Sequence, residues 1–146
     1  LKLQQLERAF KTDPSAQNLN EYCDFLGEYL CSGLAEGRVA QIQRQQYARL
    51  LARRCEREDT LELRIRYATA LADVGQIDEA QAVTDQLVID VPEEQEVWML
   101  CLRLAVMRRD GDEVHRVIDA IDKQHVYLSA DNREKLAFWR DGEEAR

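Results

Sequence analysis

Proline, glycine and long apolar runs are all scarce in this sequence. Its 146 residues include 2 prolines and 6 glycines, which is too few for a collagen-like or low-complexity chain. With 45% hydrophobic residues, the chain is also too apolar for a disordered one. No apolar run approaches the roughly 20 residues of a membrane-spanning helix, and no signal peptide is recognisable at the amino end. We therefore expect a soluble, folded domain.

Positive charge is also in deficit, because 20 basic residues face 28 acidic ones and give a formal net charge of -8. This balance disfavours nucleic acid or an anionic membrane as the main partner. One predicted helix, residues 38–57, is nevertheless basic; its arginines are Arg38, Arg44, Arg49, Arg53, Arg54 and Arg57. They could form a docking face for an acidic segment or a membrane surface. Intramolecular balance is the favoured interpretation, because Glu36, Glu56, Glu58 and Asp59 lie nearby in the sequence.

Groups that support catalysis or metal binding are few. His115 and His125 are ten residues apart with different helical facing, which matches no metal-binding or nucleophile motif. The glycines occur singly at helix junctions and form no phosphate-binding loop. Acidic clusters at helix starts and at the chain end are expected to be solvated. We therefore predict no catalytic residue, no cofactor and no metal.

The four cysteines contain no CxxC pair. Free cysteine commonly packs as a small hydrophobic residue, so we expect reduced core thiols on apolar helix faces. The residues are Cys23, Cys31, Cys55 and Cys101. This favours a reducing compartment, while disulfide pairing in the periplasm remains the alternative.

Apolar residues recur at three- and four-residue spacing from end to end, which predicts an all-α fold. The expected helices span residues 3–11, 16–31, 38–57, 61–74, 77–89, 93–108, 113–123 and 130–140. Their short connections make successive helices antiparallel neighbours. Gly33 and Gly37 mark a break, and Thr60 is an expected amino-terminal cap. In the long helix we expect an inward-facing set of Val39, Ile42, Tyr47, Leu50, Leu51 and Cys55.

An internal repeat is visible, because residues 61–94 align with residues 95–128 at an offset of 34 residues. Ala80 and Val114 occupy the same position in the two copies and let paired helices approach closely. Gly75 ends a first helix where the chain turns with positive φ, and Pro92 precedes the next first helix. Trp98 stands at the large residue that opens a first helix.

These residues resemble the tetratricopeptide-repeat (TPR) family clearly over residues 61–123 and in outline over residues 1–57. The resemblance implies an all-α, right-handed solenoid of antiparallel helix pairs in a single domain, residues 1–146. Residues 1–60 are degenerate repeats, 61–94 and 95–128 are clear repeats, and 129–146 form a capping helix and tail. Leu136 and Trp139 are expected to cover the last repeat. The segment 17–60 departs from the period by about ten extra residues, and an irregular helix bundle is the alternative.

In such a solenoid the first helix of each pair lines the concave side, so the resemblance implies a partner-binding groove there. The predicted partner-binding residues are Tyr22, Phe25, Tyr29, Arg66, Thr69, Met99, Arg103 and Met107. The alternative for Tyr22, Phe25 and Tyr29 is packing in the core. The family's carboxylate clamp for chaperone tails is not reproduced, since Glu21, Ile65 and Met99 occupy the equivalent sites.

Residues 21–34 and 128–140 also resemble the cytosolic TPR part of Pel-type polysaccharide export components. We expect a non-catalytic protein-protein interaction scaffold in a bacterial envelope, secretion or exopolysaccharide (biofilm) assembly, located in the cytoplasm. The sequence begins at Leu1 without Met and is expected to be a fragment, so it could be the cytosolic part of an inner-membrane protein. Membrane association would then come through a missing tether or a partner. A small TPR chaperone for a secretion substrate, and a homodimer through an open solenoid end, are the alternatives.

Overall fold

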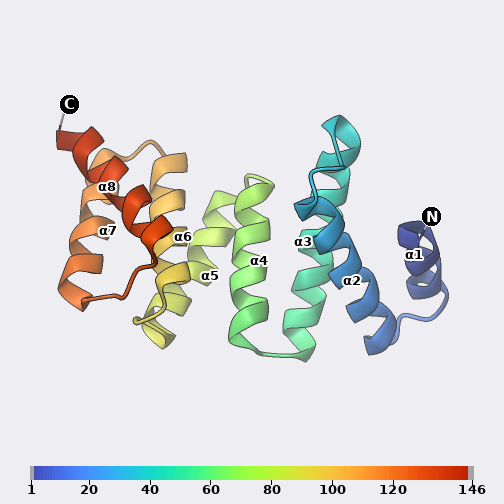
Figure 1. Ribbon diagram of the computed structural model, residues 1–146. Coiled ribbons are helices and arrows are strands. Elements are labelled where there is room, and N and C mark those ends of the chain that lie inside the picture. The colour runs from blue at the N-terminus through green and yellow to red at the C-terminus, as the bar shows by residue number, and fades with distance from the viewer. Residues whose placement is uncertain (1, 145–146) are drawn as a thin grey trace. The chain divides into compact units, whose positions relative to one another are not determined.

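The computed structural model of the chain describes residues 2–144, with side chains through residue 142. Within that range the chain forms eight helices and no strand, which confirms the all-α prediction (Figure 1). No described helix combines the length and apolar character needed to cross a bilayer. The helices are α1 (Lys2–Thr12), α2 (Ala16–Cys31), α3 (Gly37–Arg57), α4 (Leu61–Asp73), α5 (Ile77–Asp90), α6 (Gln95–Met107), α7 (Gly111–Gln124) and α8 (Ala130–Glu144).

The chain divides into two compact units, the first ending at Gly75 and the second beginning at Gln76. In the first unit α1 packs on α2, α2 on α3, and α3 on α4. In the second unit α5 packs on α6, α6 on α7, and α7 on α8. The predicted repeat 61–94 therefore draws α4 from the first unit and α5 from the second. The single domain and its repeat boundaries stay predictions.

Local signals in the sequence set the helix ends as predicted. Gly75 follows α4 with a φ of 81°, a left-handed conformation that costs a residue with a Cβ more than it costs glycine. Gly33 and Gly37 also have positive φ and flank the connection between α2 and α3. The Thr60 hydroxyl accepts a hydrogen bond from the Leu63 amide at 3.3 Å and caps the amino end of α4.

Aliphatic and aromatic side chains of α1 to α4 form the core of the first unit. Leu19 and Leu26 of α2 pack with Leu50 and Leu51 of α3, and all four are almost fully buried. The outer helix α1 adds Phe10, whose ring lies 6.0 Å from that of Tyr22. Each helix buries one stripe against its sequence neighbours, as the apolar spacing predicts.

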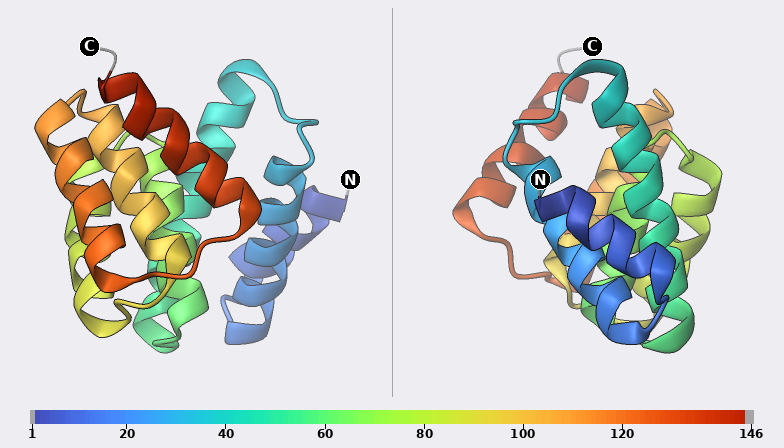
Figure 2. Two further views of the ribbon diagram at one scale, coloured as in Figure 1. Left: turned by 60° about the vertical axis from the view of Figure 1, so that its left-hand side comes forward. Right: turned by 90° about the vertical axis from the view of Figure 1, so that its right-hand side faces the viewer.

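Helix α3 departs from its predicted burial at its amino end. Leu50 and Leu51 are buried, but Val39 and Ile42 are 62% and 56% exposed, so the prediction that they face inward is wrong. The reason is length, because α3 has 21 residues while α2 has 16 and α4 has 13. The first turns of α3 extend beyond the ends of both neighbours (Figures 1 and 2). No helix of the first unit covers those turns.

The core of the second unit is built around Trp98. Its indole Nε1 donates a hydrogen bond to the Pro92 carbonyl at 2.6 Å, which ties α6 to the connection before it. Leu136 of α8 is buried in this cluster and Trp139 packs against it, so α8 covers part of the apolar face of the second unit. Gln95 Oε1 accepts hydrogen bonds from the Ser129 amide at 2.8 Å and from Asn132 Nδ2 at 2.9 Å, which anchors the start of α8.

The cysteine prediction holds for three of the four residues. All four are free thiols, with Cys23 and Cys101 buried and Cys55 half-buried. Cys31, at the end of α2, is exposed, so its assignment to the core is wrong. Burial, with smaller contributions from Asp85 and Glu113, raises the pKa of Cys101 to about 12.

We predict that removing the Thr60 cap selectively weakens the first unit. Thr60→Ala should lower the free energy of unfolding by about 1 kcal/mol, because the Leu63 amide loses its acceptor. Thr60→Ser keeps a hydroxyl and should stay near the wild type. Urea unfolding followed by circular dichroism measures both, and an equal loss in the two variants would contradict the cap.

We also predict that one thiol reacts much faster than the others in the native protein. The thiolate is the nucleophile, so the raised pKa values of Cys23, Cys55 and Cys101 slow their reaction at pH 8. The exposed Cys31 should account for the fast phase with a disulfide reagent, and Cys31→Ser should remove that phase. A fast phase that survives this substitution would show that a core thiol is accessible.

Candidate functional site

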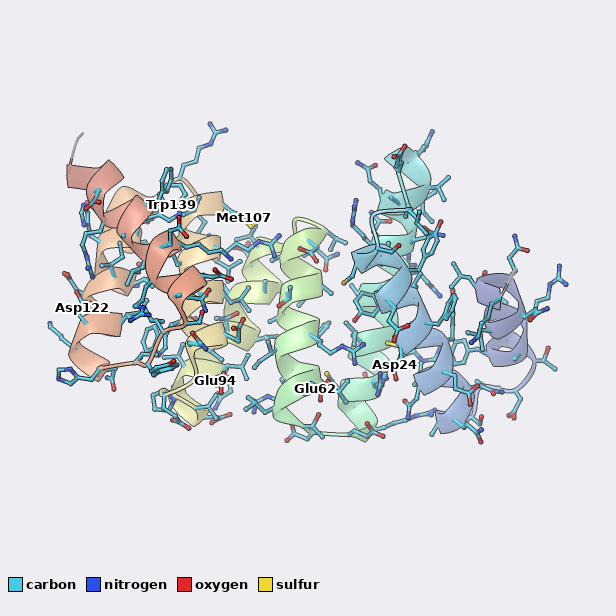
Figure 3. All side chains as sticks on the ribbon, in the orientation of Figure 1. Asp24, Glu62, Glu94, Met107, Asp122 and Trp139 are labelled. Carbon is cyan, nitrogen blue, oxygen red and sulfur yellow. The ribbon has the colours of Figure 1, made fainter. Side chains whose placement is uncertain are left out.

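The first unit contains a cleft of about 680 Å³ between α2 and α4, with α3 at its base. Asp24 and Glu62, labelled in Figure 3, come from α2 and α4, the two helices that pack on either side of α3. The lining residues are Asp24, Gly27, Glu28, Cys31, Tyr47, Arg54, Glu58, Thr60, Glu62, Leu63 and Arg66. All of them belong to the first unit, so that unit forms this cleft by itself.

The Asp24 carboxylate connects all three helices around the cleft. Its Oδ1 accepts a hydrogen bond from Nη1 of Arg54 on α3 at 2.6 Å. The same oxygen accepts from Nη1 and Nη2 of Arg66 on α4, each at 3.2 Å. Charge-assisted hydrogen bonds of this kind are the stronger ones in proteins. Asp24 therefore fixes the spacing of α2, α3 and α4 at the cleft.

Arg54 is the buried member of this network, with a side chain only 9% exposed. Desolvation alone lowers the pKa of Arg54, but its interactions with Cys23 and Asp24 outweigh that effect and raise it, so the guanidinium stays charged. Glu58 adds a weaker interaction with Arg54 at 3.9 Å. A buried charge of this type is tolerated only while its partners remain in place.

Tyr47, at the base of the cleft, is hydrogen-bonded to the second arginine, Arg66. Its hydroxyl oxygen accepts from Arg66 Nε at 3.2 Å and Nη2 at 2.9 Å. Burial raises the pKa of Tyr47, and the contact with Arg66 opposes this, so the phenol stays neutral at pH 7. On α2, a Cβ at Gly27 would lie 2.7 Å from the Tyr47 hydroxyl. Glycine at this position lets the tyrosine ring lie against the backbone of α2.

The lining of the cleft carries an excess of negative charge. Four carboxylates face two arginines, and both arginines are already paired with Asp24. Glu28 and Glu62 form no ion pair with any residue that the structure describes. They stand one helical turn from Asp24 and Arg66 respectively, at the rim. The carboxylates of Glu28 and Glu62 therefore favour a ligand with a positively charged group in the cleft.

The predicted partner-binding residues of the first unit differ in burial, and only one of them lines the cleft. Tyr22 is only 4% exposed and belongs to the core, which agrees with the alternative prediction of packing. Phe25 and Tyr29 are half-buried, and Lys2 Nζ lies 5.1 Å from the centre of the Phe25 ring. Arg66 lines the cleft. Thr69 is half-buried, and its hydroxyl donates to the Ile65 carbonyl within α4.

The other predicted residues, on α6, belong to the second unit. Met99 is half-buried and packs against the Trp98 cluster, while Arg103 is exposed. Met107 is half-buried at the end of α6 (Figure 3). Their role in binding stays a prediction.

The sequence interpretation missed most of the cleft, including Asp24, Glu28 and Tyr47. Tyr47 was expected to face inward, which it does only in part. Asp24 and Arg54 are 30 residues apart, and neither a motif nor a period connects them. Glu28 follows Asp24 by one turn of α2, so the shared helical face was the one available signal.

The arginines of α3 differ in whether an acidic side chain neutralises their charge. Arg54 has intramolecular partners, of which Glu58 at 3.9 Å was predicted and Asp24 at 2.6 Å was not. The Arg53 guanidinium lies 5.0 Å from the centre of the Phe10 ring. Arg38, Arg44 and Arg57 form no ion pair with the residues that the structure describes. Intramolecular charge balance is therefore confirmed for Arg54 but does not extend to these three.

The described residues contain no group of three histidine, cysteine or acidic side chains arranged to hold a metal ion. His125 ends α7 in a left-handed conformation with φ of 50°. No protein-family model matches the chain, and no curated protein or solved structure is significantly similar to it. The resemblance to the tetratricopeptide-repeat family stays a prediction.

We predict that Asp24→Asn lowers the free energy of unfolding by about 2–3 kcal/mol, because Arg54 stays buried without its charged partner. The matched control is Asp122→Asn, which breaks the half-exposed pair with Arg140 and should cost at most about 1 kcal/mol. Urea unfolding followed by circular dichroism compares the variants.

A double variant separates loss of the carboxylate from damage to the fold. Asp24→Asn with Arg54→Met removes both charges, so it should recover part of the lost stability. If Asp24→Asn costs no more than the control, Asp24 does not hold the three helices together.

Proposed function

We propose that the chain is a non-catalytic protein-interaction module that binds a segment of its partner in the cleft between α2 and α4. The observation that carries this proposal is the cleft itself, which is about 680 Å³ in volume and lies between two helices that are not adjacent in the sequence. Concave sites of this size suit a few side chains of a peptide.

The predicted repeat register supports the same position. If the chain follows the tetratricopeptide-repeat arrangement, α2 and α4 are first helices of successive pairs and α3 is the second helix between them. In that arrangement the first helices line the concave side, where partners bind. The α3 residues Tyr47 and Arg54 would then form the base of the groove, as they do in the cleft.

The charges of the residues that line the cleft indicate which charge a bound partner should have. Arg54 and Arg66 are engaged with Asp24, whereas the carboxylates of Glu28 and Glu62 are open at the rim. A lysine or arginine side chain of a partner peptide would gain a carboxylate at each side of the cleft. The proposed occupant is therefore a basic peptide segment.

The sequence resemblance suggests the setting of this interaction. Residues 21–34, which resemble the cytosolic part of Pel-type polysaccharide export components, include Asp24, Gly27, Glu28 and Cys31 of the cleft. The proposed biological role is a scaffold that holds a second protein of a bacterial envelope or exopolysaccharide assembly.

A peptide library displayed on phage and panned on the purified domain tests the binding function. We expect enrichment of sequences with lysine or arginine. A fluorescent copy of an enriched peptide, titrated by anisotropy, should bind Glu28→Gln/Glu62→Gln about tenfold more weakly than the wild type, because two of its ion pairs are lost.

The matched control is Glu79→Gln/Asp119→Asn, which removes the same charge from exposed positions on α5 and α7 and should leave the affinity unchanged. Equal weakening in both double variants would indicate non-specific attraction to an acidic protein. Failure to enrich any peptide whose binding depends on Glu28 and Glu62 would refute the assignment of the cleft.

A further inference from the structure

We propose that the outer face of α3 docks on an anionic lipid surface. This inference does not rest on the proposed peptide cleft. The sequence analysis considered a membrane surface for the arginines of this helix but favoured intramolecular balance, and it expected membrane association through a tether or a partner. Its basis is a line of arginines that form no ion pair with the residues that the structure describes and that ends in exposed aliphatic side chains, on a helix that extends beyond its neighbours (Figure 1).

The arginines form one line along the solvent side of α3. Arg38 and Arg49 are eleven residues apart, which is about three helical turns, so they lie on the same side of the helix. Arg53 follows Arg49 by one turn. All three side chains are exposed. With about 1.5 Å of rise per residue, this line is roughly 22 Å long.

Aliphatic side chains lie at the projecting end of that line. Val39 and Ile42 share one face of α3 because they are three residues apart, and Leu34 lies in the connection just before the helix. Leu34 is 74% exposed, so none of the three is covered by the first unit. Exposed aliphatic side chains next to arginines are the composition of helices that lie in a membrane interface.

The shape of this surface favours a bilayer over a protein. The first turns of α3 project beyond the ends of α2 and α4 (Figures 1 and 2). A protein partner would need a matching hollow, and protein interfaces draw most of their affinity from large anchors such as tryptophan and tyrosine. The exposed apolar residues here are leucine, valine and isoleucine. A lipid interface accepts such side chains without a shaped pocket.

The net charge of the whole chain does not oppose this docking as much as its value of -8 suggests. Residues 1–75 contain 11 basic and 11 acidic residues, while residues 76–146 contain 9 and 17. The excess of acid therefore belongs to the second unit. Helix α3 itself contains six arginines and one acidic residue, Glu56, with Glu36 at its amino-terminal cap. Charges farther from the lipid surface than a Debye length of about 8 Å are largely screened, so the local charge of α3 decides the attraction.

The lipid face and the cleft lie on opposite sides of α3. Tyr47 lines the cleft and Arg49 belongs to the outer line, and two residues correspond to a rotation of about 200° around the helix. Arg54 and Glu58 share the side of Tyr47. One helix can therefore serve both surfaces, and a variant of either face leaves the other intact.

Flotation with lipid vesicles tests the proposal. The wild-type chain should float with vesicles of phosphatidylcholine containing about a third phosphatidylglycerol, but not with phosphatidylcholine alone. Raising the salt to about 1 M should release it, because the Debye length falls to about 3 Å. Absence of binding to the anionic vesicles at low salt, or equal binding to both vesicle types, would overturn the proposal.

Variants locate the surface. Arg38→Glu/Arg49→Glu should reduce the partition coefficient by about thirtyfold or more, since each arginine near an anionic surface contributes about fivefold. Val39→Ser/Ile42→Ser should reduce it while the salt dependence remains. The matched control Arg116→Glu/Arg133→Glu reverses two exposed arginines of the second unit and should bind like the wild type. A control that loses binding equally would show that total charge, not α3, is responsible.

Two further measurements distinguish other outcomes. Light scattering should give the monomer mass of 17.0 kDa. A doubled mass that Val39→Ser/Ile42→Ser returns to the monomer would make this face an interface between two copies and would refute lipid docking. The peptide enriched on the cleft should bind the α3 variants with unchanged affinity, so failure of the lipid proposal and failure of the cleft proposal are separate results.

Discussion

The first unit depends on a single carboxylate, that of Asp24, which is shared by arginines from two other helices. Arg54 is almost fully buried and therefore needs this partner, because an uncompensated guanidinium would destabilise the core around Cys23 and Leu51. Arg66 reaches the same oxygen from α4 and is steadied by Tyr47. Apolar packing alone would let the helices slide, whereas these directional hydrogen bonds fix their register.

The same interaction determines which parts of α3 are available for binding. Because Arg54 donates to Asp24, the side of α3 that carries Arg54 faces α2 and α4 and forms the base of the cleft. The opposite side then carries Arg38, Arg49 and Arg53 into solvent. Because α3 is longer than both neighbours, its first turns also keep Val39 and Ile42 exposed. Both proposed surfaces follow from one buried charge and one difference in helix length.

Helices and their ends were predictable from the sequence because their causes are local. Gly75 supplies a left-handed residue and Thr60 a cap, and each acts within a few residues of its own position. Apolar spacing also predicted the burial of Leu50 and Leu51. It failed for Val39 and Ile42, because a 3.6-residue period shows which side of a helix is apolar but not where its neighbours end.

The cleft was largely unpredictable for a related reason. Its network joins residues 30 and 42 positions apart, and such pairs are set by the packing of three helices and not by any spacing in the sequence. Arg66 was predicted as a binding residue from the repeat register, but its engagement by Asp24 and Tyr47 was not. This engagement determines the chemistry of the cleft, because the paired arginines are not available to an acidic partner while Glu28 and Glu62 remain open. The cleft side of α3 is therefore proposed to bind a basic peptide, and its outer side an anionic lipid surface. The two ligands would not compete for one surface.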